Sequence, residues 1–77
     1  MNVKDFLFVN LDLLKKASLA VIGSIPVKHQ KTFLAIEQSI CLLEVNTSNI
    51  IEVKCIIDKI LRLKFELSES GINIPKN

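Results

Sequence analysis

The sequence predicts an all-α fold, a small antiparallel bundle of three helices formed by a chain of 77 residues. Two observations support this prediction. Hydrophobic residues recur at alternating spacings of three and four, which places them on one face of a helix. Turn-forming residues interrupt that pattern twice, at residues 23–26 and 46–49. The chain has only two Gly and two Pro in all, too few for a loop-rich or all-β fold.

The first helix is predicted over residues 3–22. Asn2 can cap its start, and Gly23 can adopt the left-handed conformation that ends a helix. A buried strand over residues 6–9 is the alternative, because the apolar residues there are dense enough for either structure. The core-facing positions expected for the helix are Leu7, Leu11, Leu14, Ser18 and Val21.

The second helix is predicted over residues 26–45 and the third over residues 49–70. Pro26 suits the first turn of a helix, and Asn49 followed by Glu52 resembles a capping box. Gly71 is placed to end the third helix, leaving residues 71–77 as a short tail. The expected core positions are Phe33, Ile36, Ile40 and Leu43 in the second helix, and Val53, Ile56, Ile60, Leu63 and Leu67 in the third.

The three predicted helices belong to a single domain, residues 1–77, and similar lengths with short connections favour an up-down-up arrangement. The chain holds 38 apolar residues. About 60 helical residues offer about 26 core positions in one bundle. The surplus predicts association into a homodimer, with a well-filled monomer core as the alternative. The apolar residues at the edges of the stripes are Leu11, Leu19, Leu42, Ile51, Leu61 and Phe65.

Composition excludes several classes of protein. A net charge of +2 is too even for a basic nucleic-acid-binding arm or an acidic tail, and 49% hydrophobic residues are too many for a disordered chain. The longest uncharged run, residues 17–27, is too short to span a membrane and contains Gly23 and Pro26. Asp5 and Asp12 interrupt any secretory signal. The sequence therefore predicts a reduced, cytoplasmic protein.

No pattern in the sequence predicts catalysis, a metal site or a cofactor. His29 is the only histidine, and it is expected in a solvated first turn or in contact with an acidic partner. Cys41 lies about 18 Å from His29 along the same predicted helix, so the two residues can form a dyad only between subunits. Cys41 and Cys55 are predicted to be small buried apolar residues, with a redox switch as the alternative. The chain is therefore not expected to be an enzyme.

Nucleic-acid binding is the competing hypothesis, because Lys59, Arg62 and Lys64 form a basic cluster on the third helix. A recognition helix carries base-reading polar residues in its leading turns. Here residues 49–53 are mainly apolar, with one acid. Direct contact with nucleic acid is therefore the less favoured hypothesis.

The function expected from the sequence is that of a non-enzymatic regulatory or inhibitory protein that binds an unidentified protein partner. Small helical regulators have this general appearance, although no motif connects the chain to one family. Two surfaces are candidates for partner binding, since large apolar side chains supply interface energy and charges guide approach. One is apolar, with Ile51, Leu61 and Phe65, and the other is basic, with Lys28, His29 and Lys31.

Overall fold

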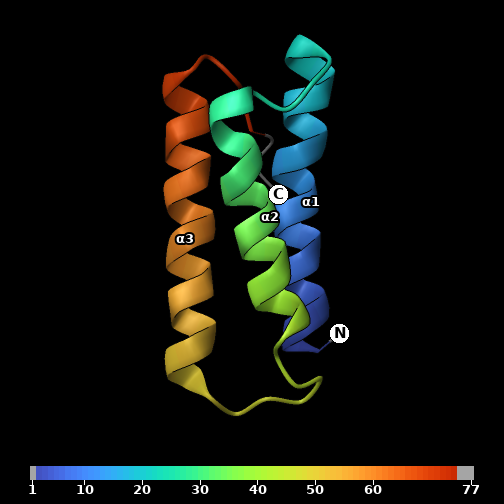
Figure 1. Ribbon diagram of the computed structural model, residues 1–77, viewed down its shortest axis with the longest axis vertical. Coiled ribbons are helices and arrows are strands. Elements are labelled where there is room, and N and C mark those ends of the chain that lie inside the picture. The colour runs from blue at the N-terminus through green and yellow to red at the C-terminus, as the bar shows by residue number, and fades with distance from the viewer. Residues whose placement is uncertain (1, 75–77) are drawn as a thin grey trace.

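The computed structural model describes residues 2–74 and shows three helices packed as a bundle (Figure 1). Helix α1 spans Val3–Ile22, α2 spans Val27–Cys41 and α3 spans Ile50–Glu69. The helices alternate in direction, and each packs against both of the others. The predicted all-α fold is confirmed. Residues 6–9 lie within α1, so the alternative of a strand there is wrong.

The predicted caps position α1 and the start of α3. The Asn2 side chain accepts a hydrogen bond from the backbone N–H of Asp5 at 2.9 Å. The Asn49 side chain accepts one from the N–H of Glu52 at 3.2 Å. Gly23 ends α1 with a φ of 75°, a left-handed conformation that glycine adopts without steric cost. The sequence therefore fixes these boundaries through local hydrogen bonds and one glycine.

The chain reverses after α3 and returns to the core. Gly71 has a φ of 89°, and the N–H of Ile72 donates to the carbonyl oxygen of Leu67 at 3.0 Å. This arrangement satisfies a terminal carbonyl and buries the Ile72 side chain, as the sequence predicted. Ile74 also packs against the core. The rest of the predicted tail, residues 75–77, lies outside the described residues.

Helix α2 is shorter than predicted, since it begins one residue later and ends at Cys41 rather than at residue 45. Lys4 of α1 explains the early end. Its Nζ donates to the carbonyl oxygens of Cys41 and Leu43, each at 3.1 Å. A cation at the negative end of the helix dipole, bonded to terminal carbonyls, stabilises the end of α2 there. This contact joins residues 37 and 39 positions apart, so the local sequence pattern does not show it.

Replacing Lys4 by methionine is expected to lower the free energy of unfolding by about 1–2 kcal/mol, because two charge-assisted hydrogen bonds are lost while the aliphatic stem is kept. Urea unfolding followed by circular dichroism measures the change. Lys28→Met is the matched control, since the exposed Lys28 side chain on α2 makes no hydrogen bond to the described residues. Equal losses in the two variants would contradict this role for Lys4.

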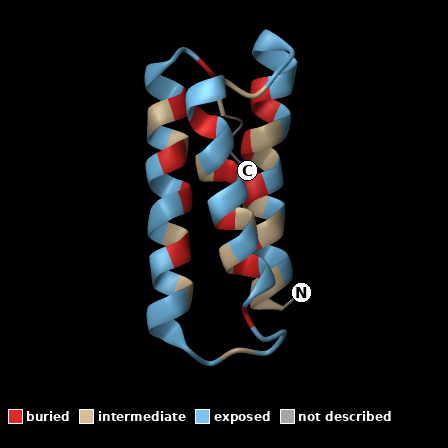
Figure 2. Ribbon diagram, in the orientation of Figure 1, coloured by how far each residue is buried: buried red, intermediate tan, exposed pale blue. Residues whose placement is uncertain are grey.

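The core lies between the three helices, where the buried positions of each helix face inward (Figure 2). Most predicted core positions are confirmed. Leu11 is only 3% exposed, so its placement at a stripe edge was wrong. Val21 is exposed because the last turn of α1 extends beyond the start of α2 (Figure 1). The buried hydrophobic residues are Leu7, Leu11, Leu14, Ala17, Phe33, Ile36, Ile40, Leu43, Ile56, Ile60, Leu63, Leu67 and Ile72.

Among residues 2–74, the bundle exposes at least as many large hydrophobic residues as it buries: thirteen large ones are exposed, and the thirteen buried hydrophobic residues include the small Ala17. Of the predicted edge residues, Leu19, Leu42, Ile51, Leu61 and Phe65 are all exposed. A single copy therefore does not cover its apolar surface. None of the three helices combines the length and the apolar character needed to cross a bilayer, within residues 2–74.

Candidate protein-binding surfaces

A groove runs between α2 and α3, and we call it the α2–α3 groove. Residues of α3 at helical spacing form one wall, and α2 contributes mainly short side chains to the other. Short side chains leave space between two packed helices, so the groove follows from the composition of this face of α2. The α3 wall includes Ile51, Cys55, Lys59, Arg62 and Glu66, and the opposite wall includes Lys31, Thr32, Ala35 and Ser39 of α2 and Leu42 directly after α2.

One section of the groove is basic. It has a volume of about 490 Å³ and contains Lys31, Lys59 and Arg62. All three side chains are exposed, and none forms an ion pair with a carboxylate among residues 2–74. Glu66 is the single acidic residue on this section, and its Oε2 lies 3.7 Å from Nδ1 of His29. This section therefore carries an excess of positive charge.

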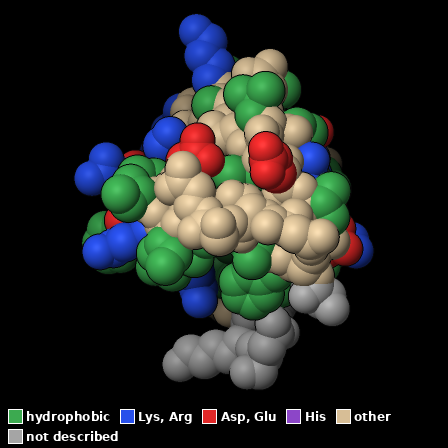
Figure 3. All heavy atoms as spheres, turned by 90° about the horizontal axis from the view of Figure 1, so that it is seen from below, with side chains coloured by type: hydrophobic (Ala, Val, Ile, Leu, Met, Phe, Trp, Pro, Cys, Tyr) green, Lys and Arg blue, Asp and Glu red, His purple; other side chains and the backbone are tan. Residues whose placement is uncertain are grey.

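The neighbouring section is apolar. It has a volume of about 260 Å³ and lies toward the loop that joins α2 to α3. Leu42 is 87% exposed and Ile51 is 77% exposed, and both line this section. Lys59 lines both sections, so they are adjacent. Figure 3, which shows this end of the bundle, has hydrophobic side chains at the surface among charged ones.

A second apolar surface lies on the side of α3 that faces away from the core, and we call it the outer face of α3. Leu61 and Phe65 are one turn apart and are 56% and 64% exposed. Neither lines the α2–α3 groove. The apolar surface predicted from the sequence is therefore two surfaces, with Ile51 in the groove and Leu61 and Phe65 outside it.

The structure also regroups the predicted basic residues. Lys31 of α2 lies in the same groove section as Lys59 and Arg62 of α3. Lys28 lies one turn before Thr32 on α2, next to the groove rather than in its lining. Lys64 is half-buried and does not line the groove. Two clusters that were separate in the sequence thus contribute to one basic surface.

The prediction that His29 lies in a solvated turn is wrong, because the residue is only 4% exposed. His29 lies one turn before Phe33 on the same buried face of α2 as Phe33 and Ile36. This spacing indicates a core position, and the prediction from the sequence did not take it into account. Its Nδ1 lies near Glu66, but Nε2 is buried with no hydrogen-bond partner among the described residues. His29 therefore cannot be a direct contact for a partner.

Replacing His29 by leucine is expected to raise the free energy of unfolding by about 1 kcal/mol, because a buried ring nitrogen without a partner costs about 1–3 kcal/mol. Thermal unfolding should then show a midpoint about 4–8 °C higher. His29→Asn, which keeps a buried polar group, should lower the midpoint. A leucine variant less stable than the wild type would show that the contact with Glu66 outweighs the cost of the orphan nitrogen.

Both cysteines are exposed and free, so the prediction that they are buried is wrong. Cys41 directly follows the core residue Ile40, and Cys55 directly precedes the core residue Ile56. Adjacent residues of a helix point about 100° apart, so both cysteines point away from the core. Cys55 lines the apolar section of the α2–α3 groove, whereas Cys41 lies at the end of α2. Neither residue is within a cluster of three His, Cys, Asp or Glu side chains, since residues 2–74 contain no such cluster.

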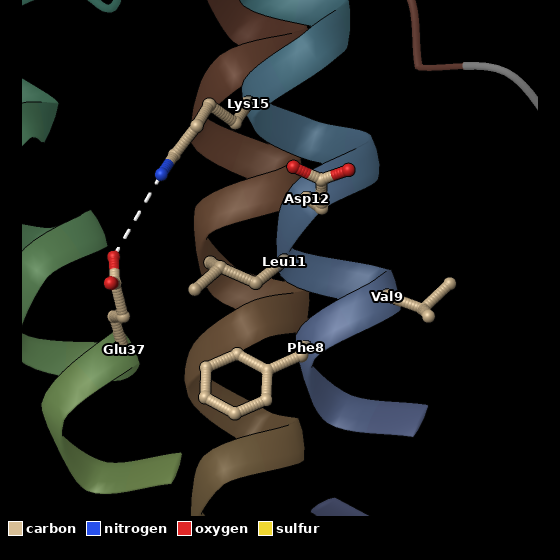
Figure 4. A pocket seen from close by; sticks show the side chains of 6 residues that line it. All are labelled: Phe8, Val9, Leu11, Asp12, Lys15 and Glu37. Carbon is tan, nitrogen blue, oxygen red and sulfur yellow. Dashed lines mark ion pairs between the residues drawn. The ribbon is translucent and has the colours of Figure 1, made fainter. Parts of the chain in front are cut away.

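A third hollow, of about 360 Å³, lies between α1 and α2 (Figure 4). Phe8 and Leu11 point into it, and Lys15 reaches across to Glu37 at 3.8 Å. Asp12 also lines it and lies 2.9 Å from Nζ of Lys16, whose pKa it raises through a hydrogen bond and charge attraction. The charged groups here already have partners, so this hollow is a weaker candidate for a binding site.

Comparison of the sequence and the structure with family models, curated proteins and solved structures finds no match. The function proposed below therefore rests on the residues and the structure of this chain alone.

Proposed function

We propose that this protein is a non-enzymatic regulatory or inhibitory module that acts by binding another protein and that works as a homodimer. The observation that carries the proposal is the outer face of α3, where Leu61 and Phe65 remain more than half exposed. An apolar patch of this kind marks an interaction surface. A domain of this size buries only part of its apolar surface in its own core. Burial of the outer face of α3 against a second copy would add to its stability.

The outer face of α3 is the same apolar surface on every copy, which favours a second copy as its occupant. In an antiparallel pair of α3 helices related by a two-fold axis at Leu61, Leu61 contacts Leu61 of the second copy. Phe65, one turn away, then lies beside this contact in each copy. The same two exposed side chains thus supply both halves of the interface.

The size of this contact bears on the expected affinity. One helix from each copy gives an interface at the low end of the range for specific complexes, about 1,200 Å² in total. Area alone does not fix affinity, and we take a dissociation constant of about 1 µM as the value against which the proposal is tested. Such a dimer is separable into monomers by dilution, so a concentration series can follow its dissociation.

The burial of His29 also favours binding over catalysis. The sequence allowed a dyad of His29 and Cys41 only between subunits. A histidine that is 4% exposed cannot reach the cysteine of another copy without a change in the bundle. The two exposed free thiols favour the cytoplasm as the location, since a reducing compartment keeps exposed cysteines unpaired.

Sedimentation velocity over a concentration series tests the proposal. A single chain has a mass of 8.7 kDa, and the dimer has twice that mass. The proposal predicts the dimer mass at concentrations well above about 1 µM and a shift toward the single-chain mass below it. A single-chain mass throughout, up to about 1 mM, would contradict it.

A further inference from the structure

We infer that the α2–α3 groove is the site for the partner, and that it binds an amphipathic helix with acidic residues at one end and large apolar residues at the other. The inference rests on the proposed function, because it names the chemistry of the protein partner. It concerns a surface other than the outer face of α3. The two proposals can therefore fail independently.

The basic section of the groove suits an anionic ligand group. Lys31, Lys59 and Arg62 come from two helices, all are exposed, and none is paired with a described carboxylate. Glu66, the one acid beside them, lies toward His29. Arg presents a planar fork of donors that matches a carboxylate. Carboxylates on a partner would therefore supply the charge that the described residues of the chain do not.

The apolar section requires a hydrophobic ligand group on the same molecule. Leu42 and Ile51 are among the most exposed hydrophobic side chains of the structure, and they lie next to Lys59. A small anion would leave them in water. A nucleic acid would place phosphates against an apolar wall and near Glu52, which also lines this section. A peptide with both acidic and apolar side chains covers the whole groove.

The length of the groove sets the length of the helical segment that we infer. Its α3 wall runs from Ile51 to Glu66, about 22 Å along the helix axis. A helix of about 15 residues has the same length, and its anchors would recur at spacings of three and four. The short side chains of Ala35 and Ser39 allow such a helix to approach the floor between α2 and α3. Ser39 Oγ already donates to the carbonyl oxygen of Ala35 at 3.0 Å, so it needs no further partner.

The test uses a fluorescein-labelled synthetic peptide of about 15 residues, with glutamates on one half of its helical face and leucines on the other half. Fluorescence anisotropy measures its affinity for the full chain. Arg62→Glu is expected to weaken binding about tenfold or more, and Ile51→Ser several-fold. Lys16→Glu on α1 is the control with the same change in charge, and it should leave affinity unchanged. Added salt should weaken binding, because exposed charges are screened.

Three results would overturn the inference. The first is the absence of peptide binding by a folded wild-type chain. The second is binding that ignores Ile51→Ser, which would show that charge alone holds the peptide. The third is salt-sensitive retention of duplex DNA that Arg62→Glu removes while the peptide does not bind, which would assign the groove to nucleic acid. Sedimentation of the same samples keeps the dimer question separate, since a monomer that binds the peptide upholds the groove and contradicts the dimer.

Discussion

Replacing Leu63 by alanine is expected to lower the free energy of unfolding by about 3–4 kcal/mol. Leu63 lies at the centre of α3 with no exposed surface, and neighbouring core residues cannot fully collapse into the space that its side chain leaves. A domain of this size has a total stability of about 5 kcal/mol, so the variant should be close to unfolding at physiological temperature. Urea unfolding at one fixed protein concentration measures the loss, because the proposed dimerisation would make stability depend on concentration.

Leu34→Ala is the matched control for Leu63→Ala. The same group of atoms is removed from a helix, but Leu34 is 55% exposed and lies outside both proposed surfaces. Its expected cost is below about 1 kcal/mol. Similar costs for the two variants would show that α3 is rotated about its axis relative to the structure described here.

Introducing glutamates at Leu61 and Phe65 together is expected to raise the dissociation constant of the dimer about a hundredfold or more. Each charge would have to be buried in an apolar contact, and the two charges introduced at Leu61 would lie close together across the two-fold axis. The monomer should remain folded, because both side chains are more than half exposed in it. Sedimentation velocity gives the dissociation constant, and circular dichroism reports the helix content.

The control for this pair is Val21→Glu with Leu34→Glu. Those residues are 52% and 55% exposed, so the variant adds the same charge at equally accessible apolar sites away from the outer face of α3. It should leave the dimer intact. Dissociation by both variants would point to net charge rather than to the contact at Leu61 and Phe65.

The helices could be predicted from the sequence because their signals are local. The spacing of the leucines and isoleucines in α3 and the caps at Asn2 and Asn49 involve residues within one or two turns of each other. The early end of α2 could not be predicted, because it depends on Lys4 of another helix. His29 was misplaced because its polarity outweighed its spacing from Phe33, although spacing decides which residues a helix turns inward.

The candidate binding surfaces were predictable as residue types but not as an arrangement. Exposed Leu61 and Phe65 follow from their position on α3 opposite the core stripe. The register between α2 and α3 brings Lys31 into the same groove as Lys59 and Arg62. This register is set by how core side chains of three helices interlock, and no local pattern encodes it.

The proposed contact between two copies through the outer face of α3 is tested most directly by isotope-filtered nuclear Overhauser spectroscopy on a mixture of labelled and unlabelled chains. At concentrations above the dissociation constant, we expect cross-peaks between the Leu61 methyl groups of the two copies, and between the Phe65 ring of one copy and the Leu61 methyl groups of the other. The absence of cross-peaks between copies, or cross-peaks confined to Leu42 and Ile51 in the α2–α3 groove, would contradict the proposed dimer.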